Sequence, residues 1–212
     1  MSPVLPGDIS LFRWADQLPP GLWEDLAHRP PEQAAEATGA SWRDGVFSID
    51  FFGAGYQVDP QARTITELRR PAHRVSYQTG VVLVTTLSRA LPVEPSGNMA
   101  TPHELPGGSL FFNGPHAIVV DAIIERYGDD PQAMIESAKA LGGEAVEAAD
   151  VAVKLPALPK VDFYVLLWTA DEEFTARAVV ALDERVVHHL ALDGVFALVN
   201  VGIHRLAAQN HG

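Results

Sequence analysis

The segment HELPGGSLFFNGPH, residues 103–116, places two histidines and a glutamate around a pair of adjacent glycines. Imidazole and carboxylate groups can ligate a metal or transfer protons near neutral pH. A glycine pair permits a sharp turn and also lets a ligand approach the backbone closely. We interpret the segment either as a turn that feeds the next helix or as a ligand-binding loop. Its candidate contacts are His103, Glu104, Gly107, Gly108 and His116.

A second set of candidates lies in the C-terminal third of the chain. The segment TADEEF, residues 169–174, contains three adjacent carboxylates, which raise one another's pKa and suit a hard cation. The alternative is a solvated turn. His188 and His189 are neighbours, so in an extended segment only one of them can face a given site. The candidate metal ligands are His103, His116, His189, Asp171, Glu172 and Glu173.

Several common chemistries are absent from this sequence. The chain has no cysteine, which excludes disulfides, thiolate zinc sites, iron–sulfur clusters and cysteine nucleophiles. Any metal held by the protein therefore needs His, Asp or Glu ligands. The G-x-G in FFGAGYQV, residues 51–58, lacks the third glycine and the following helix of a dinucleotide site, so we interpret it as a turn or a bulge.

The charge of the chain argues against polyanionic partners. The formal net charge is −12, and residues 101–212 carry seven Lys and Arg against 16 Asp and Glu. The only basic run, ELRRPAHR at 67–74, is short. A phosphate backbone or an anionic membrane would be repelled, so neither partner is expected, whereas a basic protein partner is compatible. No apolar run is long enough to span a bilayer, and no secretory signal is visible, so we expect a cytoplasmic protein.

The elements that must position these residues alternate between helical and extended patterns. Apolar residues recur at helical spacing, with proline at several starts and glycine at several ends. Asp193 is expected to cap the last helix. We predict helices over 20–29, 31–39, 73–91, 114–128, 129–143 and 192–209.

The extended segments are rich in β-branched and aromatic residues. We predict one strand at 46–53, two strands within 56–68, a strand from residue 144 that the PALP at 156–159 interrupts, and a hairpin of two strands around the acidic turn TADEE. This order favours an α+β fold with a mostly antiparallel sheet packed with helices. We expect a helical N-terminal extension over residues 1–45 and a single α+β domain over residues 46–212.

The order of these landmarks resembles a bacterial and archaeal family known as domain of unknown function 3786. The resemblance covers about residues 46 to 206 and is firmest after residue 104. The matching positions are Glu104, Leu105, Gly107, Gly108, Gly142, Gly143, Trp168, Asp171, Glu172, Glu173, Phe174, Asp183, His189 and Asp193. Family members often carry an appended cysteine-rich iron–sulfur domain and are linked to corrinoid metabolism, so the resemblance implies cofactor handling. This chain departs from that pattern, because its sequence contains no cysteine.

Three functions follow as hypotheses. The first is a small-ligand or cofactor-binding protein whose leading ligand is a tetrapyrrole (haem or corrinoid) or a divalent metal. Its site is expected where the 103–116 segment meets the C-terminal hairpin and His189. The second is an enzyme that uses Glu104, the carboxylates of 171–173 and His189 as acid–base groups. The third is an acidic module that binds a basic protein.

Overall fold

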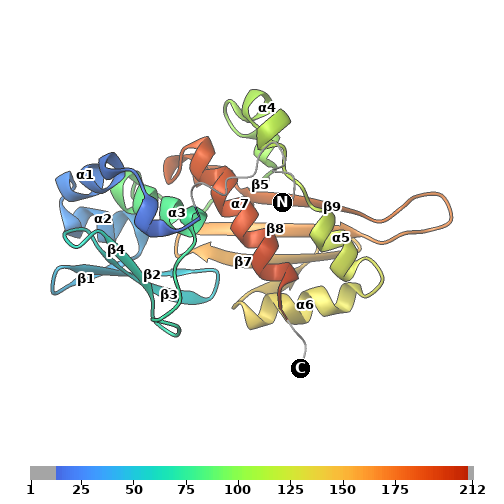
Figure 1. Cartoon of the computed structure of the whole chain (residues 1–212). Coiled ribbons are helices and arrows are strands. Elements are labelled where there is room, and N and C mark those ends of the chain that lie inside the picture. Colours follow the sequence, from blue (N-terminus) through green and yellow to red (C-terminus); the bar gives the residue numbers. More distant parts are fainter. Residues whose placement is uncertain (1–12, 210–212) are drawn as a thin grey trace, which may run out of the picture.

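The structure is a computed structural model and describes residues 13–209. Two antiparallel β-sheets form the framework of the molecule. The smaller sheet has the strand order β1-β2-β3-β4, and the larger sheet has the order β5-β9-β8-β7-β6. Helices pack beside the smaller sheet and across one face of the larger sheet (Figure 1). The expected α+β class is thus confirmed. Within residues 13–209, no helix is both long enough and apolar enough to cross a membrane.

The N-terminal part of the chain forms two short helices and the four-stranded sheet. Each helix begins at a proline, because an N–H group in the first turn has no partner within the helix and its absence costs nothing. The FFGAG segment is the turn between two adjacent strands, as expected. The bounds are α1 Pro20–His28, α2 Pro31–Thr38, β1 Ser41–Arg43, β2 Val46–Phe51, β3 Ala54–Asp59 and β4 Thr64–Glu67.

The larger sheet is built around the nearly continuous apolar segment VDFYVLLW. Its strand lies in the middle of the sheet, and Phe163, Val165 and Leu167 alternate toward the buried face. The expected hairpin with the next strand is confirmed. The bounds are β5 Met99–Ala100, β6 Glu144–Val146, β7 Val151–Leu158, β8 Val161–Trp168 and β9 Arg177–Asp183.

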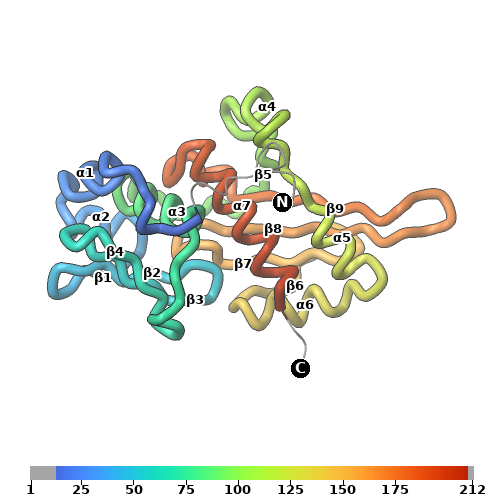
Figure 2. The backbone as a smooth tube through the Cα atoms, viewed as in Figure 1, coloured from blue at the N-terminus to red at the C-terminus, as the bar shows by residue number. Residues whose placement is uncertain are grey.

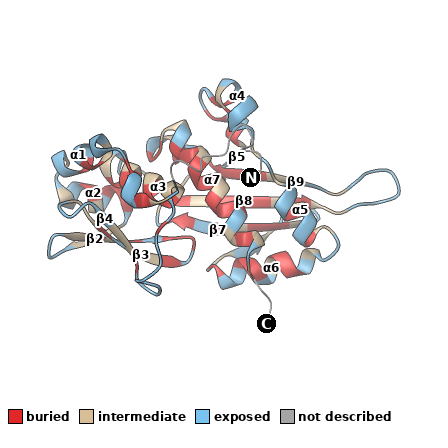
Figure 3. Ribbon diagram, in the orientation of Figure 1, coloured by how far each residue is buried: buried red, intermediate tan, exposed pale blue. Residues whose placement is uncertain are grey.

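The long C-terminal helix lies across the larger sheet and also packs against the helix beside the smaller sheet. Burial is concentrated along these contacts, as Figure 3 shows. Phe52, after β2, meets Phe163 of β8 edge to face at 5.4 Å, so one hydrophobic core joins both sheets. The helices involved are α3 Tyr77–Arg89, α5 Asp121–Tyr127, α6 Pro131–Ala140 and α7 Leu192–Ala207.

Three local predictions are wrong. The helix expected over 114–128 is divided into a 3-10 turn, Gly114–His116, and α5, which begins at Asp121 where an acidic side chain suits the helix dipole. The N-cap of α7 is Ala191, and Asp193 instead accepts a hydrogen bond from the Gly194 N–H within the first turn. Pro156 does not interrupt β7. The pairing with β8 instead shifts register between residues 156 and 158, and the strand continues through the proline.

Two segments extend beyond the body of the molecule. The tube in Figure 2 shows the β8–β9 hairpin projecting from the larger sheet and a small lobe that carries α4, Gly108–Phe111. These segments contain two of the predicted candidate sites, the acidic turn and the glycine pair. The fold therefore places these two candidate sites apart from each other.

Candidate functional site

Glu104 stabilises the turn in which it lies. Its carboxylate accepts hydrogen bonds from the N–H and the hydroxyl of Thr101, each at 2.8 Å, and so caps the 3-10 turn Pro102–Glu104. These hydrogen bonds, from the backbone first and the hydroxyl second, hold the pKa of Glu104 below its usual range. The side chain still lines a cavity that also contains His188 and Glu184. The turn thus lies beside residues 184–188, which precede His189, but the acidic hairpin turn does not line this cavity.

The glycine pair is required by packing. Gly107 has a φ of 79°, in the left-handed region. A Cβ on Gly108 would lie 1.9 Å from the carbonyl oxygen of Pro102, which no side chain can tolerate. The interpretation as a sharp turn is confirmed, and ligand contact at these glycines stays a prediction.

The two histidines of the segment make aromatic contacts. The ring of His116 stacks on Phe111 with centroids 4.4 Å apart, and its edge meets Phe196 of α7 at 5.3 Å. His103 lies 6.1 Å from the ring of Phe112. Both imidazoles thus help to hold the α4 lobe.

His189 is enclosed in the core, with 1% of its surface exposed. Neither ring nitrogen makes a well-aligned hydrogen bond to the described residues, although the backbone of Val93 lies close enough to favour the charged form. Burial, and then the charges of Lys160 and His188, hold the pKa of His189 below its ordinary value. His189 therefore resides in the fold as a neutral imidazole.

The acidic turn lies at the tip of the β8–β9 hairpin. Asp171 accepts hydrogen bonds from the N–H groups of Glu173 and Phe174 at 2.8 and 2.7 Å, which closes the turn. Among residues 13–209, no three His, Asp or Glu side chains come together closely enough to hold a metal ion. The predicted convergence of His103, His116, His189 and the carboxylates of 171–173 on one metal is therefore not found.

A different cavity gathers positive charge. It has a volume of about 490 Å³, and we call it the basic cleft. It lies between the end of the smaller sheet, the loop before α3, the start of α3 and the end of α7. Its charged and imidazole-bearing lining residues are Glu67, Arg70, His73, Arg74, His204 and Arg205.

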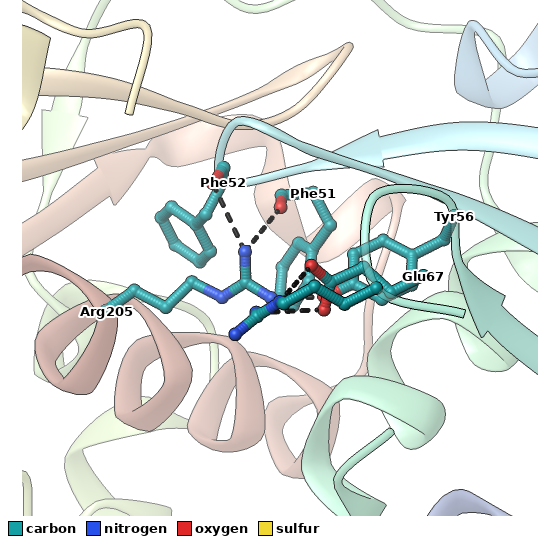
Figure 4. Close-up of polar contacts among 6 residues, drawn as sticks. Phe51, Phe52, Tyr56, Glu67 and Arg205 are labelled. Atoms are coloured by element: carbon teal, nitrogen blue, oxygen red, sulfur yellow. Dashed lines mark hydrogen bonds and ion pairs between the residues drawn. The ribbon is translucent and has the colours of Figure 1, made fainter. Parts of the chain in front are cut away.

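Arg205, near the end of α7, is the central cation of the cleft. Its Nη1 donates to the carbonyl oxygens of Phe51 and Phe52, each at 3.3 Å, and its Nη2 donates to the hydroxyl of Tyr56. Tyr56 in turn donates to Glu67 at 3.5 Å. Figure 4 shows these groups meeting between α7 and the smaller sheet. Because carbonyl groups and the Tyr56 hydroxyl carry no charge, none of these three contacts neutralises the positive charge of Arg205.

Glu67 is the single carboxylate among the lining residues of the cleft. It is 7% exposed, and Arg70 binds both of its oxygens at 2.8 and 3.0 Å. Burial alone would raise the pKa of Glu67, but the hydrogen bonds and charge of Arg70, with the charge of Arg205, outweigh burial and hold it below its usual range. Glu67 is thus ionised, and two arginines face one negative charge.

The remaining basic groups lie at the rim. His73, Arg74 and His204 are exposed, and Arg74 forms an exposed ion pair with Asp16 at 2.6 Å. The first turn of α3 also lines the cleft, with its N-cap Ser76 accepting from the N–H of Thr79 at 3.2 Å. The N-terminal end of a helix carries partial positive charge. The cleft therefore has a positive balance in a chain whose net charge is −12.

The cleft was missed as a site, although part of its signal is visible in the sequence. The basic run at 67–74 supplies Glu67, Arg70, His73 and Arg74. Arg205 gives no such signal, because a cation in the last turn of a helix is ordinary. Only the fold brings it to Tyr56, 149 residues away.

Comparisons with known proteins identify a family. No curated protein and no solved structure matches the chain. A family model described as "Domain of unknown function (DUF3786)" matches residues 30–205, which is most of the chain and includes the basic run and Arg205. The suspected resemblance is thereby confirmed, and the chain belongs to the domain of unknown function 3786 family.

Proposed function

We propose that the protein binds a small anionic ligand, a carboxylate or a phosphate, in the basic cleft. The observation that carries the proposal is the pairing of Arg70 and Arg205 with a single buried carboxylate, Glu67, inside a cavity of about 490 Å³. A ligand anion would supply the missing negative charge. Guanidinium groups bind carboxylates and phosphates in a planar, directional manner.

The cleft combines a fixed interior with an accessible rim. Arg205 is held by two carbonyl groups and by Tyr56, so its guanidinium is positioned before any ligand arrives. His73 and His204 at the rim are exposed and can reach a ligand with little rearrangement of the core. A preorganised interior lowers the entropic cost of binding.

The tetrapyrrole class stays a prediction within this proposal. Haem carries two propionates, which meet the requirement for an anion, and the imidazoles that line the cleft are His73 and His204. A metal held by protein ligands alone has less support, because no group of three donors is brought together within residues 13–209.

The test is a titration of the full chain with phosphate, pyrophosphate, succinate and haem, followed by calorimetry and, for haem, by absorption. We expect saturable binding of at least one anion. In the double variant His73→Gln, His204→Gln, affinity should fall about tenfold, the effect of one charge-assisted hydrogen bond. The matched control is His28→Gln, an exposed histidine on α1. Absence of saturable binding, or equal affinity in the double variant and the control, would contradict the proposal.

A further inference from the structure

A second cavity lies at the base of the β8–β9 hairpin, outside the basic cleft. Its volume is about 540 Å³, and we call it the hairpin pocket. It is formed by both strands where they leave the body and by the loop before β7. Its lining residues are Asp150, Trp168, Thr169, Asp171, Phe174, Thr175 and Arg177.

Two aromatic rings form part of the wall. Trp168 ends β8 and is partly exposed, and Phe174 follows the acidic turn with 69% of its surface exposed. Exposing a phenylalanine to this degree costs apolar solvation free energy. A ligand that covers the ring would recover that free energy.

The pocket already shows that it accepts a cation against an aromatic face. The guanidinium carbon of Arg177 lies 4.1 Å from the ring centroid of Trp168. At this distance the quadrupole of the indole attracts positive charge. A cationic ligand can make the same kind of contact with the exposed ring of Phe174.

Two carboxylates supply the countercharge. Asp150 accepts the N–H and hydroxyl of Thr169 through Oδ2, at 3.0 and 3.3 Å, and Asp171 closes its turn through Oδ1. The other oxygen of each carboxylate has no hydrogen bond to the described residues. The N–H groups of Glu173 and Phe174 hold the pKa of Asp171 below its usual range, so it is ionised. Against these two charges the lining contributes one cation, Arg177.

We infer that the hairpin pocket binds an organic ammonium group, with Trp168 and Phe174 contacting its alkyl surface and Asp150 and Asp171 balancing its charge. A hard metal ion fits less well, since it requires about six oxygen ligands and gains nothing from aromatic walls. An alkylated ammonium gains from both the rings and the carboxylates. This inference stands independently of anion binding in the basic cleft.

The test compares choline with its uncharged isostere 3,3-dimethylbutan-1-ol, titrated into the full chain at constant ionic strength. Choline should bind saturably and the alcohol should not. Phe174→Ala should weaken choline binding about fivefold, the effect of losing one cation–aromatic contact. Asp150→Asn should weaken it as well, and Arg177→Gln should strengthen it by removing the competing cation. The matched controls are Leu110→Ala, which removes an apolar side chain that is even more exposed than Phe174, and Asp25→Asn on α1.

A further titration, with a short peptide that carries trimethyllysine, distinguishes an ammonium group on a protein side chain from one on a free amine. Tighter binding of the peptide than of choline would assign the pocket to a protein side chain, and the reverse order would assign it to a free amine. Either order supports the inference. Equal binding of choline and the alcohol, saturable binding of neither choline nor the peptide, or the same loss in Phe174→Ala and Leu110→Ala would overturn it.

Discussion

At the scale of single residues, His189 couples the stability of the fold to pH. Burial and Lys160 lower its pKa in the folded state, so the unfolded chain binds the proton more readily. The ordinary pKa of histidine, about 6.5, applies to the unfolded chain. Above this pH, His189 makes its full contribution to the free energy of unfolding, and the contribution is lost as the pH falls below it. Urea unfolding at pH 7.5 and pH 5.5 should therefore show lower stability at the acidic pH.

The variant His189→Leu isolates this contribution. Leucine cannot take up a proton, so the loss of stability between the two pH values should be smaller in the variant than in the parent protein. The exposed His28→Gln serves as the control and should retain the parent's pH dependence. An unchanged pH dependence in His189→Leu would show that other groups govern acid sensitivity.

At the scale of elements, the turn before α4 depends on close backbone contact. The variant Gly108→Ala would place a methyl group against the Pro102 carbonyl, and overpacking of this kind costs about 3 kcal/mol. Gly21, in α1, has no atom near its missing Cβ, so Gly21→Ala should be neutral or stabilise the protein by up to about 1 kcal/mol. Thermal unfolding of both variants measures the contrast. Equal stabilities would mean that the turn can relax around the methyl group.

Elements that depend on local chemistry were predictable from the sequence. Pro31 and Gly39 bound α2, and Asp130 caps α6 through the N–H of Ala133. The errors occurred where local signals competed. Pro115 signals a helix start, yet the chain extends after His116 and the helix restarts at Asp121.

The candidate sites divide in the same way. The sequence predicts that Asp171 lies in a turn, and its carboxylate closes that turn through local hydrogen bonds. Glu104, predicted as a candidate ligand contact or acid–base group, also closes a turn in this way. The basic cleft depends on contacts between Arg205 and the β2–β3 region, across about 150 residues of chain. No local pattern encodes which strand that arginine reaches, so its role had to come from the tertiary structure.

At the scale of the whole molecule, the two sheets should unfold together. One hydrophobic core spans both, and the Phe52 N–H donates to the Ala157 carbonyl at 2.9 Å. Urea transitions followed by tryptophan fluorescence and by far-ultraviolet circular dichroism should therefore coincide. Arg205→Met should lower the free energy of unfolding by about 2 kcal/mol and shift both midpoints together to lower urea, because it removes charge-assisted hydrogen bonds between α7 and the smaller sheet. Separate transitions would indicate two independently folding units.

The strands at the margins of both sheets share one property, which is their length. β5 and β6 have two and three residues, and β1 and β4 have three and four. A strand this short offers few free N–H and carbonyl groups to a passing chain, whereas the long apolar β8 is protected between two neighbours. Concentrated solutions of the folded protein should therefore resist the edge-to-edge association that leads to fibrils.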